Sequence, residues 1–136
     1  MAWTGGCLCG ACRYSIDGAV EDVAHCHCGM CRRASGGIVT TWLTVARPAF
    51  RWLTDAAAAY RSSAGARRLF CPTCGAQLVF DQDAAAYVDV TVATLDRPQD
   101  MPATRHIWCE SRLPWLHLDQ DLPAEARETD PLGPGG

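Results

Sequence analysis

The pattern of apolar and polar positions predicts short strands rather than helices along most of this chain. Residues 86–93 alternate best, with apolar side chains at 86, 88, 90 and 92, as in a strand with one buried face. Residues 38–45 are β-branched or aromatic and lie between a glycine pair and Pro48, which also indicates a strand. Weaker versions of this pattern predict strands at residues 12–16, 50–53, 78–80 and 106–109.

Helix signals are few. Residues 54–60 begin with Thr54 and Asp55, which could cap a helix, and the alanines that follow predict one or two turns without an apolar stripe. Residues 31–36 predict a single turn. We therefore expect one mainly β domain over residues 1–124 and a flexible tail over residues 125–136, where proline and glycine accumulate.

Composition narrows the class of protein. The chain has 136 residues, enough for one ordinary domain, and its 49% of hydrophobic and 20% of charged residues are typical of globular proteins. A net charge of −3 argues against a general nucleic-acid binder, which needs a basic excess. All 12 basic residues are arginines, which excludes lysine Schiff-base chemistry. We expect no membrane span, no export signal and a cytoplasmic location.

Nine cysteines are the main chemical signal, and their number rules out complete disulfide pairing. In a reducing compartment, clustered thiols are more often metal ligands or catalytic groups than disulfides. Cys109 stands apart, and the other cysteines form three groups. Two of these groups share the pattern C-x-C-G-x-C-R, which indicates two copies of one metal-loop geometry. The groups are Cys7/Cys9/Cys12, Cys26/Cys28/Cys31 and Cys71/Cys74.

The close spacing within each group is typical of zinc sites, in which four thiolates surround the ion tetrahedrally. The pair Cys71 and Cys74 supplies two ligands and needs another pair from elsewhere in the chain. The three groups together could fill two closed four-sulfur sites. Alternatively, the central trio could leave a fourth position open to water or substrate, as catalytic sites do. The spacing does not decide between these arrangements.

Three longer motifs and their order along the chain resemble the glutathione-dependent formaldehyde-activating enzyme family, also called the centromere-protein-V-like family. The similarity extends over about residues 5–118. It is carried by Gly6-Cys7-Leu8-Cys9-Gly10 with Arg13-Tyr14, by Cys26-His27-Cys28-Gly29-Met30-Cys31-Arg32 with Ala34-Ser35-Gly36, and by Phe70-Cys71-Pro72-Thr73-Cys74-Gly75. Further matches are Thr94-Leu95-Asp96, His106-Ile107-Trp108 and Pro114-Trp115-Leu116.

This resemblance implies a β-rich, Mss4-like (β-tent) domain of short antiparallel strands organised around two zinc ions. By the family pattern, Cys7, Cys9, Cys71 and Cys74 hold a closed structural zinc. Cys26, Cys28 and Cys31 hold a catalytic zinc whose fourth position is open to a thiol. Cys12 departs from the family pattern. It is either a spare buried thiol or a fourth ligand that closes the second site.

The implied function is that of a zinc-dependent carbon–sulfur lyase, which forms or cleaves a thiol–aldehyde adduct such as S-hydroxymethylglutathione. The substrates would be a small-molecule thiol, with glutathione favoured, and an aldehyde. Free thiols are mostly protonated at neutral pH, and an open zinc can lower the pKa of a bound thiol. The alternative is a non-catalytic zinc-binding interaction or scaffold module on the same fold. Either function is compatible with a homo-oligomer.

Several other side chains are candidates for the site. A zinc ion with three thiolates carries a net negative charge, which Arg13, Arg32 or Arg33 could offset. Arg32, Arg33 and Ser35 are also candidate contacts for glutathione carboxylates.

Residues outside these motifs receive structural expectations. His25 and His27 could ligate zinc, although loop hydrogen bonds are the commoner role, and His106 is expected in a pocket wall. The tryptophans are expected in the core or in a pocket wall, and Cys109 is expected to be a packed thiol. The tryptophans meant are Trp42, Trp52, Trp108 and Trp115.

Overall fold

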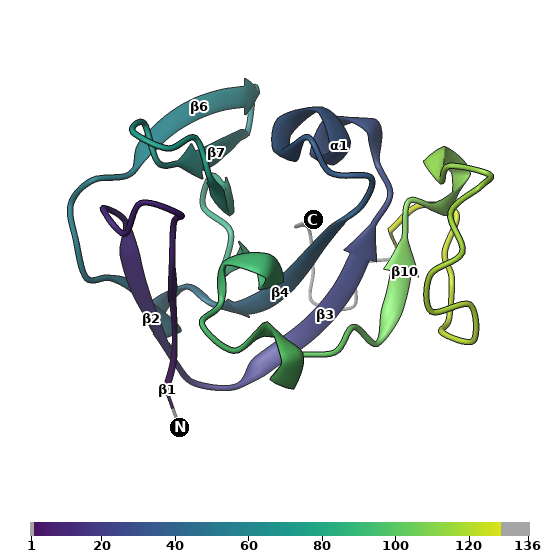
Figure 1. The fold of residues 1–136 in the computed structure, drawn as a ribbon, viewed down its shortest axis with the longest axis horizontal. Coiled ribbons are helices and arrows are strands. Elements are labelled where there is room, and N and C mark those ends of the chain that lie inside the picture. The colour runs from purple at the N-terminus through teal and green to yellow at the C-terminus, as the bar shows by residue number, and fades with distance from the viewer. Residues whose placement is uncertain (1, 129–136) are drawn as a thin grey trace.

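Two β-sheets make up most of the molecule, and the computed structural model describes residues 2–128 (Figure 1). The smaller sheet has the order β1 (Ala2–Gly6), β2 (Arg13–Asp17) and β5 (Phe50–Trp52). The larger sheet has the order β10 (Arg105–Ile107), β3 (Val20–Cys26), β4 (Thr40–Ala46), β9 (Tyr87–Thr91), β8 (Gln77–Gln82), β7 (Ala66–Phe70) and β6 (Ala58–Ser63). Helix α1 (Gly29–Ser35) connects β3 to β4. Short 3-10 turns lie at Arg47–Ala49, Val92–Thr94, Pro98–Asp100 and Cys109–Ser111.

Neighbouring strands pair antiparallel, as expected, with the exception of β10, which pairs parallel to β3. Parallel partners need a long connection, and β3 and β10 are separated by residues 27–104, of which residues 92–104 lead from β9 to β10 through two 3-10 turns. The register places His106 beside His25 and Ile107 beside Cys26. This pairing brings the last strand against the segment that carries the central cysteines.

The strand alternation sorts side chains between a core and a cavity. Along β4, Leu43 and Val45 are fully buried in the core that lies under the smaller sheet, while Trp42 and Thr44 line a cavity on the opposite face. Strand β9 continues this division, with Val90 in the core and Asp89 at the cavity. The same two strands therefore stabilise the fold and build one wall of the cavity.

The predicted mainly β fold is confirmed, and all six predicted strands are present with shifted ends. The predicted helix at residues 54–60 is wrong, because residues from Ala58 onward form β6 and pair with β7. An alanine run without an apolar stripe cannot outweigh a complete strand ladder. The single turn predicted at residues 31–36 is part of α1, which ends at Gly36 with φ 72°. Strands β1, β3, β6 and β7 were not predicted.

The segment predicted as a tail begins against the domain. The N–H of Glu125 donates to the carbonyl of His106, and the N–H of Cys109 donates to the carbonyl of Glu125. Residues 129–136 of that segment lie outside the described residues. Within residues 2–128, no helix has the length and apolar character that a membrane span requires.

Candidate active site

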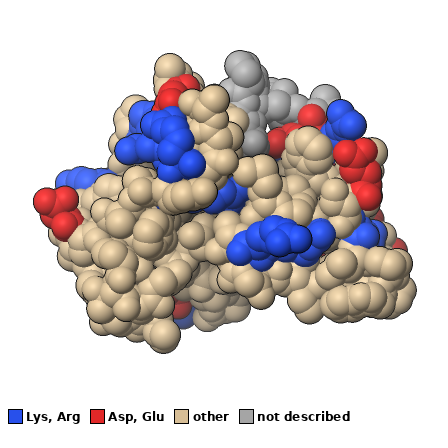
Figure 2. Space-filling view, turned by 90° about the horizontal axis from the view of Figure 1, so that it is seen from above, with Lys and Arg blue, Asp and Glu red and all other residues tan. Residues whose placement is uncertain are grey.

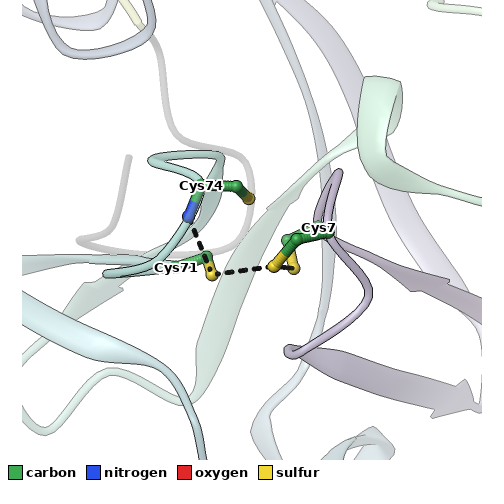
Figure 3. A group of neighbouring side chains, drawn as sticks. Cys7, Cys71 and Cys74 are labelled. Atoms are coloured by element: carbon green, nitrogen blue, oxygen red, sulfur yellow. Dashed lines mark hydrogen bonds between the residues drawn. The ribbon is translucent and has the colours of Figure 1, made fainter.

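Four cysteines from two turns in different sheets converge. Cys7 and Cys9 follow β1, and Cys71 and Cys74 follow β7 (Figure 3). The Sγ atom of Cys9 lies 3.6 Å from that of Cys7 and 3.7 Å from that of Cys71. All four sulfur atoms lie within 4.8 Å of one another, so this four-cysteine cluster could hold a metal ion.

Backbone N–H groups donate hydrogen bonds to sulfur atoms of this cluster, which favours the thiolate form of the cysteines. The N–H of Cys12 donates to Cys7 Sγ at 3.2 Å, and the N–H of Cys74 donates to Cys71 Sγ at 3.5 Å. The Cys74 N–H lowers the pKa of Cys71 to about 6, against the opposing effect of burial. Gly75 closes this turn with φ 83°, a conformation that favours glycine. Because zinc binds thiolates, the local backbone suits the ion.

A second group of thiols lies where β3 ends and α1 begins. Cys28 is the N-cap of α1, and its Sγ accepts a hydrogen bond from the N–H of Cys31 at 3.3 Å. The Sγ atoms of Cys26 and Cys31 lie 3.6 Å apart, and both residues are buried. Within residues 2–128, no histidine, carboxylate or fourth cysteine joins this three-cysteine cluster. It therefore offers three ligands where the other cluster offers four.

Hydrogen bonds among the three thiols shift their pKa values in opposite directions. Hydrogen bonds from Cys26 and Cys31 hold the pKa of Cys28 far below its ordinary value. The hydrogen bond to Cys28, then the one to Cys31 and burial, raise the pKa of Cys26. A divalent cation would displace the remaining protons, and a thiol-rich site of this kind suits zinc.

A buried arginine lies directly beside this cluster. Arg68 of β7 is 5% exposed, and both terminal nitrogens of its guanidinium lie 3.8 Å from Cys31 Sγ. Its guanidinium carbon also lies 4.9 Å from the centre of the Phe80 ring, a cation–π contact. Arg68 therefore supplies positive charge where three thiolates and one divalent ion would leave a net negative charge.

A cavity of about 470 Å³ opens onto the three-cysteine cluster. Cys26, Cys28, Cys31 and Arg68 form part of its wall, and none of the residues of the four-cysteine cluster lines it. Much of the remaining wall is apolar, so a small organic molecule could reach the three sulfurs in a partly dry environment. The apolar wall comprises Ala24, Met30, Trp42, Phe80, Ile107 and Trp108.

Comparison with known proteins agrees with this geometry. Residues 2–111 match the sequence model of the glutathione-dependent formaldehyde-activating enzyme (GFA) family. The chain belongs to the GFA family. The fold of this family is Mss4-like. A crystal structure of a protein from Rhodobacter sphaeroides is similar in fold, with a TM-score of 0.57 and 21% sequence identity over 90% of this chain and 99% of that chain. No curated protein matches the chain.

The arginines suggested by the GFA motifs do not line the cavity. Arg13 forms a salt bridge with Asp96 at 2.7 Å. Arg32 donates to the backbone carbonyls of His27 and Ser111, at 2.7 Å each. Arg33 is exposed on α1. The guanidinium in contact with the sulfurs is that of Arg68, so a role of Arg13, Arg32 or Arg33 in offsetting the charge stays a prediction without a direct contact to support it.

Ser35 also lies away from this cavity. Its hydroxyl donates to the carbonyl of Cys31 at 2.9 Å, and it lines a second hollow together with His25 and Thr41. Ser35 therefore fixes the end of α1, and its predicted contact with glutathione finds no geometric support.

Cys12 lies outside both clusters. It is fully buried in the core with Cys7 and Cys71. Burial, followed by a hydrogen bond with the Cys71 thiol, raises the pKa of Cys12 to about 12. It does not close the three-cysteine cluster. Cys109 is half-buried at the start of a 3-10 turn, and burial raises its pKa.

Three of the four histidines lie close together, with His106 between the rings of His25 and His27, and none of the four joins a cysteine cluster within the described residues. His106 Nε2 donates to the carbonyl of Asp119 at 2.9 Å, so its Nδ1 accepts from His27 Nε2 at 2.8 Å. Burial and His106 lower the pKa of His27 to about 4, so it is neutral. His25 bridges Thr41 and Asp119, at 2.7 Å each.

Among the tryptophans, Trp42 and Trp108 line the cavity, and Trp52 packs against Tyr14. Trp115 is 61% exposed, so its predicted place in the core or a pocket wall is wrong.

Proposed function

We propose that this GFA-family protein is a zinc-dependent carbon–sulfur lyase that forms or cleaves a thiol–aldehyde adduct at the three-cysteine cluster. The proposal rests on the difference between the two cysteine clusters in ligand number and in access to the cavity. The four-cysteine cluster offers a complete set of ligands, while the other cluster has three ligands and faces a cavity. Closed zinc sites are structural, and sites with an open position are catalytic.

The proposed reaction adds a thiol to formaldehyde. The sulfur forms a bond to the carbonyl carbon, the carbonyl π bond breaks, and the thiol proton ends on the oxygen to give an S-hydroxymethyl adduct. The reverse step breaks the carbon–sulfur bond. A zinc ion with an open position would lower the pKa of a thiol that binds there, and so supply the nucleophilic thiolate at neutral pH.

The chain's own residues support this chemistry in two ways. Cys26, Cys28 and Cys31 would hold the ion, and the α1 N-cap geometry fixes the position of Cys28. Arg68 places a desolvated positive charge beside Cys31, which favours binding of a further anionic sulfur at a centre already rich in thiolates. The apolar wall limits water at the sulfurs, which strengthens these electrostatic interactions.

The name of the family implies glutathione as the thiol and formaldehyde as the electrophile. A non-catalytic zinc module on the same fold is the competing function. The difference between the two is whether the second zinc exchanges and responds to a thiol.

The test measures zinc content per chain with and without excess thiol, together with the rate of adduct formation above the uncatalysed rate. We expect two zinc ions per chain, with one that exchanges readily. Cys28→Ser should lose the exchangeable ion and the rate acceleration, whereas Cys109→Ser, a cysteine outside both clusters, should keep both. If Cys28→Ser accelerates the reaction as well as the wild type does, the enzyme proposal fails and the module is favoured.

A further inference from the structure

His27, which separates two cysteines of the three-cysteine cluster, lies outside the cavity wall. Cys26 and Cys28 line the cavity, whereas His27 does not and is 1% exposed. Within residues 2–128, the Nδ1 atom of His27 is buried and has no hydrogen-bond partner. In this part of the chain the ring of His27 is therefore held by one hydrogen bond, which its Nε2 donates to Nδ1 of His106 at 2.8 Å.

The backbone of His27 is tied to the same part of the molecule. Its N–H donates to the carbonyl of Ile107 at 3.1 Å, and its carbonyl accepts from Arg32 at 2.7 Å. The same nitrogen of Arg32 also donates to the carbonyl of Ser111, in the 3-10 turn that follows β10. The loop that carries the first two thiols of the cluster therefore rests on β10 and on the turn after it.

His106 is itself fixed by the segment that follows β10. Its Nε2 donates to the carbonyl of Asp119 at 2.9 Å. Its backbone N–H donates to the carbonyl of Pro123 at 2.8 Å, and its own carbonyl accepts from the N–H of Glu125 at 3.0 Å. Asp119 has φ 45°, which is uncommon for a residue with a side chain and persists where surrounding contacts fix the backbone. The ring of His106 is therefore a fixed support for the ring of His27.

His106 touches neither the cavity nor the cysteine sulfurs. It is 1% exposed, it is absent from the cavity wall, and within the described residues it joins neither cysteine cluster. Any effect of its side chain on the cluster must therefore pass through His27. Groups that orient metal ligands from behind are important, because their loss typically costs about 10-fold to 100-fold in metal affinity or activity.

We infer that His106 is a positioning residue for a zinc ion at the three-cysteine cluster. By accepting the hydrogen bond from His27, it keeps the loop in the shape that holds the sulfurs of Cys26 and Cys28 within reach of one ion. This inference rests on the proposed function in that it requires zinc at this cluster. Without the support of His106, the loop would move more freely and the ion would leave faster.

Two substitutions separate the two hydrogen bonds of the His106 ring. His106→Asn places an amide oxygen where Nδ1 lay, so it can still accept from His27. His106→Gln can reach the carbonyl of Asp119 but offers no acceptor at the position of Nδ1. In the zinc-loaded full chain, transfer of the exchangeable ion to a chelator should be about tenfold faster in His106→Gln and within about threefold of the wild type in His106→Asn.

The ligand environment of the metal gives a second measurement. With Co²⁺ in place of the exchangeable zinc, the ligand-field absorption should change in His106→Gln and match the wild type in His106→Asn. His27→Phe removes the donor and should speed zinc transfer as much as His106→Gln does. Because the two residues act through one hydrogen bond, the double variant should be no faster than either single variant.

The control is His117→Gln. It makes the same substitution at an exposed histidine, whose Nδ1 accepts from Gln120 at 2.8 Å. Zinc transfer and Co²⁺ absorption should both stay at their wild-type values.

The outcomes separate this inference from the proposed function. Equal zinc transfer in His106→Asn and His106→Gln, whether at the wild-type rate or faster, overturns the inference, and so do additive effects in the double variant. A wild-type chain that binds both zinc ions and does not accelerate adduct formation overturns the enzyme proposal. The metal measurements then still decide the inference, because neither of them needs turnover. A count of one zinc per wild-type chain overturns both, so this count is made first.

Discussion

The two cysteine clusters are built on similar loops but differ in the number of ligands and in their access to a cavity. The four-cysteine cluster draws two ligands from the turn between β1 and β2 and two from the turn between β7 and β8, so it joins the smaller sheet to the larger one. The three-cysteine cluster comes from one short segment and opens onto a cavity. A metal that crosslinks two sheets contributes to folding, whereas a metal at the end of one helix can be lost with less damage.

The largest expected effect is the loss of the folded state in Cys71→Ser. A structural zinc contributes about 10 kcal/mol or more to folding, which is comparable to the whole stability of an ordinary domain. Circular dichroism and zinc content should therefore show an unfolded chain without metal. The control is Cys12→Ala, which removes a buried thiol next to the same cluster and should stay folded with its zinc. A cooperative thermal transition at the wild-type temperature in Cys71→Ser would contradict this role.

Cys28→Ser should separate function from folding. Serine is a good helix N-cap and can accept from the N–H of residue 31, so α1 should persist. We expect the thermal midpoint to change by only a few degrees while one zinc per chain is lost. If Cys28→Ser unfolds as Cys71→Ser does, both clusters are structural and the contrast between them disappears.

An intermediate effect is expected at Arg68. Arg68→Met keeps the volume against Phe80 and removes the charge beside Cys31, so kcat/KM should fall by about tenfold or more. The zinc of the three-cysteine cluster should also transfer faster to a chelator. Arg68→Lys restores a charge without the planar fork and should recover part of both properties. Wild-type kcat/KM in Arg68→Met, which keeps the packing, would show that the charge of Arg68 has no role.

The smallest effect is expected at Asp96, which braces the hairpin that carries Cys7 and Cys9. Hydrogen bonds from Arg13 and Thr4 lower the pKa of Asp96 to about 2, so its stabilisation is present above pH 4 and is lost as the pH falls toward 2. Asp96→Asn should lower stability by about 0.5–1 kcal/mol at pH 7. The thermal midpoints of the variant and the wild type should converge near pH 2, and a constant gap would exclude this mechanism.

Sequence reasoning located the cysteine clusters because ligand spacing is a local property. Cysteines one or two residues apart beside glycine predict a metal loop without knowledge of the fold. The alternation at residues 86–93 likewise predicted β9 because one face of that strand is buried in the core, and the β-branched and aromatic composition of residues 38–45 predicted β4. Pairing of the groups, however, required the resemblance to the family.

Arg68 was missed because its role depends on contacts between distant strands. The segment Ala66–Phe70 contains two adjacent arginines, which by composition indicate a solvated surface. Their burial differs because β7 pairs with β8, which brings Phe80 beside Arg68 and sends Arg67 to Asp81 on the other face. Arg68 lies two residues after Ala66 on the same buried face of β7, and because the sequence did not predict β7, this position gave no signal.

The sequence predicts from net charge that the chain is not a general nucleic-acid binder, and this stays a prediction on which the placement of the arginines bears. On the face shown in Figure 2, the described arginines form separate groups divided by uncharged surface. Several arginines of the described chain, on whichever face they lie, are paired with acids; Arg47 and Arg67, for example, share Asp81. Paired and dispersed charges attract a phosphate backbone less strongly than one continuous basic band would.

The guanidinium of Arg105 holds the last described residues of the chain against the larger sheet. Arg105 forms ion pairs with Glu125 and Glu128 as well as with Asp22 on β3, and Glu128 is part of the wall of the cavity at the three-cysteine cluster. A chain that ended at residue 124 would therefore lose Glu128 from the cavity wall, and of these three acidic partners Arg105 would keep Asp22. The segment that the sequence predicts to be a flexible tail therefore begins as part of the wall around the three-cysteine cluster.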